Sequence, residues 1–296
     1  MSIHEAAEAL GRLGHSVRRG IDRGADDTTS RFQDGSAWRV EIPSCEGPDV
    51  MDAVVAEAQA REVPVHRVSQ GSGVMMLTDD EIRRMVALGE QHGIEVCLFT
   101  GPRGAWGTGA QSRVSTGVGA AARGNREVAA CVAEAHRAVR LGVTSLLVGD
   151  LGVLTVLGEL KKAGDLPEEL VLKTSVLMPL TNGPTAALYE QLGATSLNLS
   201  TDLDVVTIGE IRAAVRVPLD VYVEVPDDQG GAVRFYDVPE IVRAAAPVYL
   251  KLGVRNAPNI YPSGLHLVDT AVRLGRERVR RAELVLRLLA EQQDAR

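Results

Sequence analysis

The feature that most constrains the fold of this chain is a short β-rich run followed by a helical segment, repeated eight times. The β-rich runs span residues 38–44, 63–69, 94–100, 143–150, 170–176, 195–200, 218–225 and 247–253. The helical segments cover about 49–61, 79–92, 125–141, 151–163, 184–192, 204–215, 238–245 and 265–292. Because strand–helix–strand connections are right-handed, eight such units in series are most simply satisfied by a closed (β/α)₈ barrel.

The length of 296 residues suits one barrel, so we predict a single α/β domain over residues 1–296. Residues 1–37 form a lead-in with an extra helix at about 3–19, which is placed to close the barrel bottom. The Gly-rich loop 101–124 follows the third strand and is far longer than ordinary connections. We therefore expect this loop to lie over the carboxyl-terminal mouth of the barrel.

Composition and charge argue against several classes of protein. The net charge of -7 argues against a protein that binds nucleic acid over its whole surface. The charged N-terminus lacks the apolar centre of a signal peptide, and no apolar stretch is long enough for a membrane helix. The three cysteines lie far apart and form no metal-ligand spacing. These features predict a cytoplasmic protein with no membrane association; a homo-oligomer remains open.

Period-two alternation in the predicted strands separates an apolar face, which packs on helices, from a polar face, which fills the barrel. The polar side chains assigned to the interior are Arg39, Glu41, Lys173, Ser175, Ser196, Asn198, Ser200, Asp220, Tyr222, Glu224, Tyr249 and Lys251. An ordinary barrel interior is filled by Val, Ile and Leu, and an unpaired buried charge costs several kcal/mol. Either an ion-pair network plugs this barrel, or a ligand or metal site lies at its mouth; we favour the site.

Catalytic roles are assigned to five side chains: Glu224, Lys251, Glu41, Lys173 and His66. Glu224, Lys251 and Glu41 come from strands that are neighbours in a closed barrel, and Glu224 is taken as the central acid–base group. Glu41 and Glu224 could also share a divalent metal, Mg²⁺ or Mn²⁺. On the second strand either His66 or the next residue faces the site, and we favour His66.

Substrate-binding roles are assigned to Arg255, Asn256, Asn198, Arg103, Arg113, Tyr222 and Gln70. Arg255 and Asn256 follow the eighth strand, where barrels commonly bind anions, and a guanidinium pairs bidentately with carboxylate or phosphate. Gln70 opens the sequence QGSG, whose backbone N–H groups either hold an anion or form a plain turn. The predicted substrate is a small polar or anionic molecule.

Residues 142–225 resemble the core of the peptidase U32 family. The resemblance lies in VTSLLVGDLGVL, in VLKTSVLMPLTNGPTAALYEQLGATSLNLSTDLDVVTIGEI and in PLDVYVEV, which follow one another in the family's order. Family members include collagenase-type peptidases and proteins that hydroxylate RNA bases or quinone precursors. Glu224 stands where the family has His, and the cysteines that bind an iron–sulfur cluster in some members have no counterpart after Val225. We therefore expect no iron–sulfur cluster.

These observations favour a U32-like barrel enzyme, a hydrolase or a lyase, that uses carboxylate and lysine acid–base chemistry. Two alternatives stay open. One is a non-catalytic or accessory subunit that binds a partner with the barrel mouth. The other is a protein that modifies RNA, which the net charge disfavours and the arginines of loop 101–124 favour.

Overall fold

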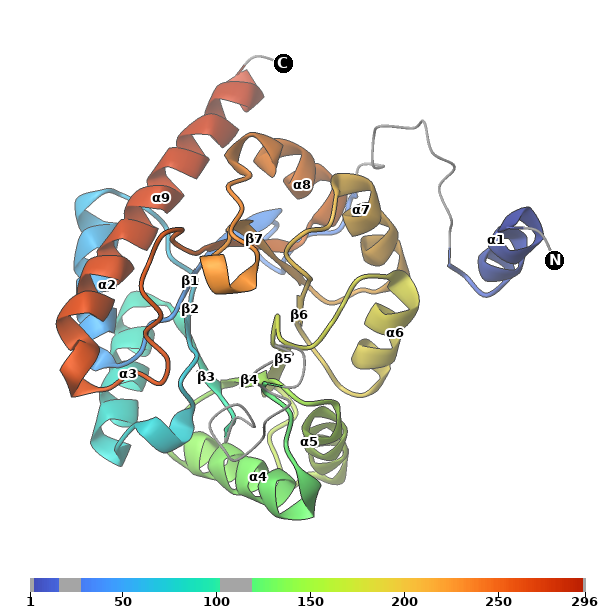
Figure 1. Cartoon of the computed structure of the whole chain (residues 1–296). Helices are drawn as coiled ribbons and strands as arrows, with labels where there is room; N and C mark the ends of the chain where they lie inside the picture. Colours follow the sequence, from blue (N-terminus) through green and yellow to red (C-terminus); the bar gives the residue numbers. More distant parts are fainter. Residues whose placement is uncertain (1–2, 16–27, 102–118, 295–296) are drawn as a thin grey trace.

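In the computed structural model, which describes residues 3–15, 28–101 and 119–294, eight parallel strands form the centre of the molecule (Figure 1). The strands are β1 (Trp38–Pro43), β2 (Arg67–Gln70), β3 (Glu95–Phe99), β4 (Ser145–Val148), β5 (Val171–Thr174), β6 (Leu197–Asn198), β7 (Leu219–Glu224) and β8 (Val248–Leu252). Their order in the sheet is β5-β4-β3-β2-β1-β8-β7-β6. The predicted eight-stranded parallel architecture is confirmed.

The sheet closes between β5 and β6. Thr174 N–H donates to the carbonyl of Ser196 at 3.0 Å, and Thr195 N–H donates to the carbonyl of Leu172 at 2.8 Å. A parallel bridge pairs Lys173 with Ser196. With β1 paired to β8 as well, the strands form a (β/α)₈ barrel.

Figure 1 shows α2 to α9 arranged around the outside of the strands, with α1 set apart from this ring. The helices are α1 (Ile3–Arg12), α2 (Pro48–Ala60), α3 (Asp79–His92), α4 (Gly124–Arg140), α5 (Leu151–Ala163), α6 (Gly183–Gln191), α7 (Val205–Ala214), α8 (Val238–Ala245) and α9 (Val268–Asp294). The outward strand residues, such as Val40, Ile42 and Leu250, are buried against these helices in the main hydrophobic core. The apolar core therefore lies between strands and helices, and the barrel interior is left to polar groups.

Local sequence explains where several helices begin. Asp150 caps α5 by accepting from Val153 N–H at 2.9 Å, and Asn182 caps α6 by accepting from Thr185 N–H at 2.9 Å. Short acceptor side chains satisfy backbone donors that have no partner in the first turn of a helix. The capping bond thus gives Asp150 a structural role at the start of α5.

The extra N-terminal helix does not close the barrel bottom. α1 ends at Arg12, and the following His15 has its Nδ1 3.7 Å from where a Cβ would lie on Gly183. Gly183 begins α6 and also packs on Ala214 at the end of α7, so this contact lies on the outer, helical wall of the barrel. Within the described residues, no helix is long and apolar enough to span a bilayer.

Candidate functional site

A cavity of about 260 Å³ opens at the carboxyl ends of the strands. Its described lining residues are Pro43, Ser44, Ser69, Gln70, Gly71, Gly119, Leu147, Ser175, Val176, Leu177, Asn198, Tyr222, Asp228, Gln229, Lys251, Asn259 and Tyr261. They come from β1, β2, β4, β6, β7 and β8 and from loops after the strands, among them the loops after β3 and β5, so the cavity is the barrel mouth. We call it the mouth pocket. This end of a (β/α)₈ barrel is where active sites of such enzymes lie.

Lys251 is the one cation among the described residues that line the mouth pocket. Its Nζ lies 4.3 Å from the centroid of the Tyr222 ring and 3.4 Å from Glu41 Oε1. With the amide of Asn198 turned so that its oxygen faces the lysine, that oxygen accepts from Lys251 Nζ at 2.8 Å. The ammonium group is thus held in place by a ring face, an amide and a carboxylate.

Beneath Lys251 lies a layer of buried charges that spans the barrel. Glu41 contacts both Lys173 and Arg67, while Ser69 Oγ donates to Glu41 at 2.6 Å. Asp220 accepts from Arg67 at 2.8 Å, and its carboxylate lies 3.3 Å from Lys173 Nζ. Because every charge in this layer has an opposite partner, the layer plugs the barrel and forms a floor for the mouth pocket.

The two carboxylates of this layer have opposite pKa shifts. Burial alone would raise the pKa of Glu41, but the charges of Lys173, Lys251 and Arg67 together lower it well below its ordinary value. For Asp220 burial dominates, and its pKa is raised although Lys173 and Arg67 act against the rise. Glu41 is therefore a weak base, and Asp220 is the carboxylate that holds a proton more readily.

Two tyrosines form part of the pocket wall. Burial raises the pKa of both Tyr222 and Tyr261, so both phenols keep their protons at neutral pH. The Tyr261 hydroxyl is 2.5 Å from the hydroxyl of Ser44. The ring of Tyr261 packs so closely on Gly71 that a Cβ there would lie 2.7 Å from ring atom Cε1. The mouth pocket thus offers neutral O–H donors beside one ammonium group.

Glu224 does not face the barrel interior, so its predicted orientation is wrong. The pairing of β7 with β8 shifts register between Tyr222 and Glu224, so Tyr222 pairs with Lys251 while Glu224 pairs with Leu252. One extra residue at a bulge moves the following side chain to the other face of the sheet. Glu224 consequently accepts from Arg255 N–H at 2.9 Å and lies 3.5 Å from a guanidinium of α9.

This orientation also separates the predicted metal pair. Glu41 is enclosed by cations inside the barrel, while Glu224 is on the helix-facing side. In residues 3–15, 28–101 and 119–294, no three His, Cys, Asp or Glu side chains are grouped as metal ligands. Glu41 and Glu224 therefore do not form a shared site for Mg²⁺ or Mn²⁺.

On β2 the inward residue is Arg67, which corrects the preference for His66. Arg67 is 2% exposed, bonds to Glu95 at the bottom of the interior and stacks on the Tyr249 ring at 3.6 Å. His66 precedes the strand and accepts from Val40 N–H through Nδ1 at 3.1 Å. Burial lowers the pKa of His66, which is consistent with a neutral structural histidine at the end of the barrel opposite the mouth.

Only some of the predicted substrate-binding residues line the mouth pocket. Asn198, Tyr222 and Gln70 line the mouth pocket. Arg255 is half-exposed, lies outside the pocket lining and pairs with Asp227 at 3.3 Å.

The other three predicted substrate-binding residues are Asn256, Arg103 and Arg113. Asn256 is exposed, and its backbone N–H donates to Asp227. Arg103 and Arg113, with residues 102–118 of the predicted loop 101–124, fall outside the described residues. Gly119, at the described end of that loop, lines the mouth pocket.

A side chain of the protein itself fills the turn formed by the sequence QGSG, whose backbone N–H groups were a candidate anion site. Glu46 accepts from Gly71 N–H at 2.8 Å and from Ser72 N–H at 2.9 Å. A carboxylate of the protein thus takes the place that a phosphate would have in a nest of backbone donors.

Sequence reasoning did not single out Ser69 or Tyr261 as site residues. Ser69 lies on the inward face of β2, in phase with Arg67, so assigning that strand to the other face hid it. Tyr261 lies in the loop after β8, where no periodicity points to a pocket.

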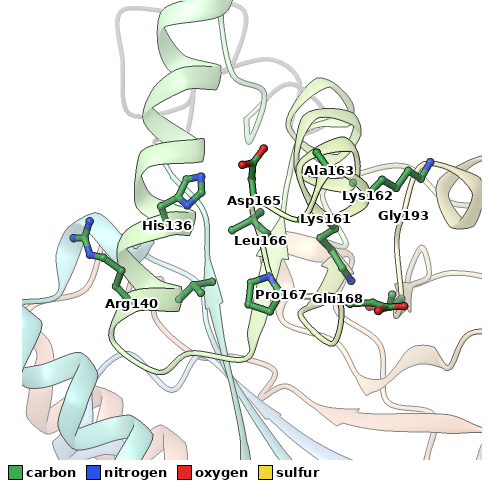
Figure 2. Close-up of a pocket in the computed structure, with 14 residues that line it drawn as sticks. His136, Arg140, Lys161, Lys162, Ala163, Asp165, Leu166, Pro167, Glu168 and Gly193 are labelled. Atoms are coloured by element: carbon green, nitrogen blue, oxygen red, sulfur yellow. The ribbon is translucent and has the colours of Figure 1, made fainter.

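A second, wider groove of about 1050 Å³ lies between the ends of α4 and α5 (Figure 2). Both positive and negative side chains line it, among them Arg140, Lys162 and Asp165. These helix ends lead into the amino ends of β4 and β5, so the groove is at the opposite end of the barrel from the mouth pocket. Active sites of (β/α)₈ enzymes lie at the carboxyl ends of the strands, so we take the mouth pocket as the candidate site.

The fold and its polar mouth define an α/β-barrel protein with an enclosed, charged interior. The model of peptidase family U32 matches residues 110–225, less than half of the chain. The chain is therefore U32-like over its central segment. No match was found among curated proteins.

Several solved structures have a similar fold. A putative copper homeostasis protein, CutC, from Streptococcus agalactiae has 14% identity and a TM-score of 0.47, with 72% of this chain and 98% of that chain covered. A U32 peptidase has 15% identity and a TM-score of 0.44, with 73% of this chain and 93% of that chain covered. A putative lyase/mutase from Burkholderia cenocepacia has 14% identity and a TM-score of 0.44, with 91% and 84% covered.

Proposed function

We propose that this chain is a barrel enzyme that binds a small substrate with a carboxylate or carbonyl group in the mouth pocket and acts as a lyase by acid–base chemistry. The observation that carries the proposal is the position of Lys251, an ammonium group at the pocket floor among uncharged donors. A fixed cation in a water-poor site stabilises negative charge that develops on a substrate oxygen.

Each neighbour of Lys251 has a definite part in this chemistry. Asn198 and the Tyr222 ring orient the ammonium group. The Tyr222 phenol, whose pKa burial raises, holds a proton that it donates to the developing oxyanion or to a leaving group. These roles suit a C–C cleavage that needs no separate base, the loss of CO₂ from a carboxylate β to a carbonyl. The C–C bond breaks, CO₂ leaves, the electron pair passes into an enolate oxygen at Lys251, and the Tyr222 phenol supplies the proton that the product takes up.

The hydrolase alternative needs a nucleophile, and Ser69 is the best-placed hydroxyl. Its Oγ donates to Glu41 at 2.6 Å and lies 3.5 Å from Lys173 Nζ. Activation of a serine requires an adjacent base, but the cations around Glu41 lower its pKa and make it a weak one. We therefore favour the lyase over the hydrolase.

The remaining alternatives receive less support. The described lining of the mouth pocket carries one lysine and one aspartate, Lys251 and Asp228, which is not the basic channel that an RNA strand would follow. An accessory subunit would bind a ligand in the same pocket without converting it.

The test compares Lys251→Gln with Arg255→Gln, a matched change of a cation that lies outside the pocket. Small carboxylates and 2-oxo acids are screened by thermal shift, and the affinity of each hit is measured by calorimetry. Lys251→Gln is expected to weaken binding by roughly 10- to 100-fold, the value of a hydrogen bond to a charged group, while Arg255→Gln leaves it unchanged. Equal affinities for wild type and Lys251→Gln would contradict the proposal.

Turnover separates the chemical alternatives. Loss of the bound compound, followed by NMR, is expected with wild type and with Ser69→Ala, because the lyase reaction does not use that hydroxyl. Turnover abolished by Ser69→Ala would favour the hydrolase. Binding without any conversion would favour the accessory subunit.

A further inference from the structure

The turn Asp227–Gln229, which follows β7, forms part of the wall of the mouth pocket. Asp228 and Gln229 both belong to the pocket lining. The backbone of Gln229 is fixed on two sides, because its N–H donates to the carbonyl of Pro226 at 3.0 Å and its carbonyl accepts from the hydroxyl of Thr201 at 2.8 Å. The side chain of Gln229 is therefore held at a defined place in the pocket wall.

The amide oxygen of Gln229 is unsatisfied. Oε1 is enclosed and accepts no hydrogen bond within the described residues. Buried polar side-chain atoms nearly always have a partner, because an acceptor that leaves water without meeting a donor destabilises the protein. An unsatisfied acceptor on a residue of a pocket wall therefore indicates a donor that a ligand brings.

Three other amide side chains line the described pocket, and the chain itself uses the oxygen of each. Gln70 pairs both ends of its amide with the backbone of Gly73, at 3.0 and 3.1 Å. The oxygen of Asn198 accepts from the ammonium group at the pocket floor. The oxygen of Asn259 accepts from a backbone N–H two residues later, at 2.9 Å. Gln229 differs from all three in having an amide oxygen that the described chain does not use.

The Gln229 oxygen can reach a ligand without any change of the backbone. The last torsion of a glutamine side chain is broad, and this oxygen has no hydrogen bond to break when the amide turns. Because the same side chain already forms part of the pocket surface, a rotation of the amide presents the oxygen to the cavity.

We propose that Gln229 is a specificity-determining residue whose amide oxygen accepts a hydrogen bond from a hydroxyl or ammonium group of the ligand in the mouth pocket. The inference rests on the proposed function only in taking this pocket as the substrate site. An amide oxygen accepts and does not donate, so it selects a ligand that carries a donor. The substrate then has two recognised parts: an oxygen at Lys251 and a donor group at the turn after β7. An analogue without the donor leaves the acceptor unpaired and binds more weakly.

Matched acids that differ in one terminal group test this role. Calorimetry with the full chain compares butyrate with 4-hydroxybutyrate and 4-aminobutyrate, and pentanoate with its 5-hydroxy and 5-amino derivatives. Wild type is expected to bind at least one donor-bearing acid about threefold or more tightly than the parent acid, the value of one hydrogen bond. Comparison of the hydroxy and amino acids shows which donor the site takes.

Gln229→Leu removes the acceptor and keeps a side chain of similar length. It is expected to abolish the preference for the donor-bearing acid and to leave the affinity for the parent acid unchanged, because the parent acid has no donor for Gln229. Gln91→Leu is the matched control, since Gln91 is exposed on α3 and lies outside the pocket; it should keep the full preference.

Gln229→Glu decides the question if Gln229→Leu does not fold. A carboxylate is a stronger acceptor for a charged donor, so this variant is expected to increase the preference for the amino acid over its parent. The proposal is overturned if wild type prefers none of the donor-bearing acids, if Gln229→Leu keeps the wild-type preference, or if Gln229→Glu leaves it unchanged.

The two proposals fail in different ways. If Lys251→Gln leaves the affinity of carboxylate ligands unchanged while Gln229→Leu loses the preference for a donor, the proposed function is wrong and the role of Gln229 stands. If Gln229→Leu keeps the wild-type preference while Lys251→Gln loses ligand binding, the role of Gln229 is wrong and the proposed function stands.

Discussion

Replacing Glu41 by Gln tests the account of the barrel interior most directly. Glu41 is fully buried and has three cationic neighbours, Lys173, Arg67 and Lys251. Gln keeps the shape but leaves these cations with less negative charge. Breaking a buried ion pair by removing one partner costs about 3 to 5 kcal/mol, a large part of the stability of a typical domain.

The pKa shifts make the comparison with Asp220→Asn decisive. The folded-state pKa of Glu41 is lowered, so its contribution to stability is present above its unfolded pKa of about 4.3 and is lost as pH falls through the folded pKa. The folded-state pKa of Asp220 is raised, so folding disfavours its ionised form above that pKa. At pH 7, Glu41→Gln should therefore destabilise the protein more than Asp220→Asn.

Urea unfolding at pH 7 and near pH 4 measures both effects. We expect Glu41→Gln to lower the free energy of unfolding by about 3 to 5 kcal/mol at pH 7 and Tm by roughly 10 °C. The difference from wild type should shrink as pH falls below about 4, where the wild-type carboxylate begins to lose its advantage. A loss under about 1 kcal/mol at pH 7, or an equal loss for Asp220→Asn, would refute the reasoning.

Two further changes test the bulge and the pocket wall. Glu224→Gln should lower the free energy of unfolding by about 1 to 3 kcal/mol, because it weakens a buried hydrogen bond and an ion pair. Ligand affinity should stay unchanged. A 100-fold loss of turnover without destabilisation would instead show that Glu224 is catalytic. Gly71→Ala should displace the Tyr261 ring and lower the free energy of unfolding by about 1 to 3 kcal/mol. Urea unfolding measures the stability, and a crystal structure of the variant shows the ring position. An unmoved ring with unchanged stability would contradict the close contact.

The sequence alone determines the order and type of the elements. Strand–helix alternation with apolar outer faces leaves few arrangements other than a closed barrel, and the structure has all eight strands. Alternation also placed Glu41, Lys173 and Lys251 in the interior, where the structure has them. Side-chain direction repeats every two residues in a regular strand, so this part needs no tertiary information.

The tertiary structure decides what depends on register and on contacts between distant segments. The bulge in β7 turns Glu224 away from the interior, and an alternation rule that assumes a regular strand cannot detect it. Arg67 rather than His66 faces inward because its partners, Glu41, Asp220 and Glu95, come from three other strands. Local pattern fixes which face a side chain can take, but only closure of the barrel fixes which charges meet there.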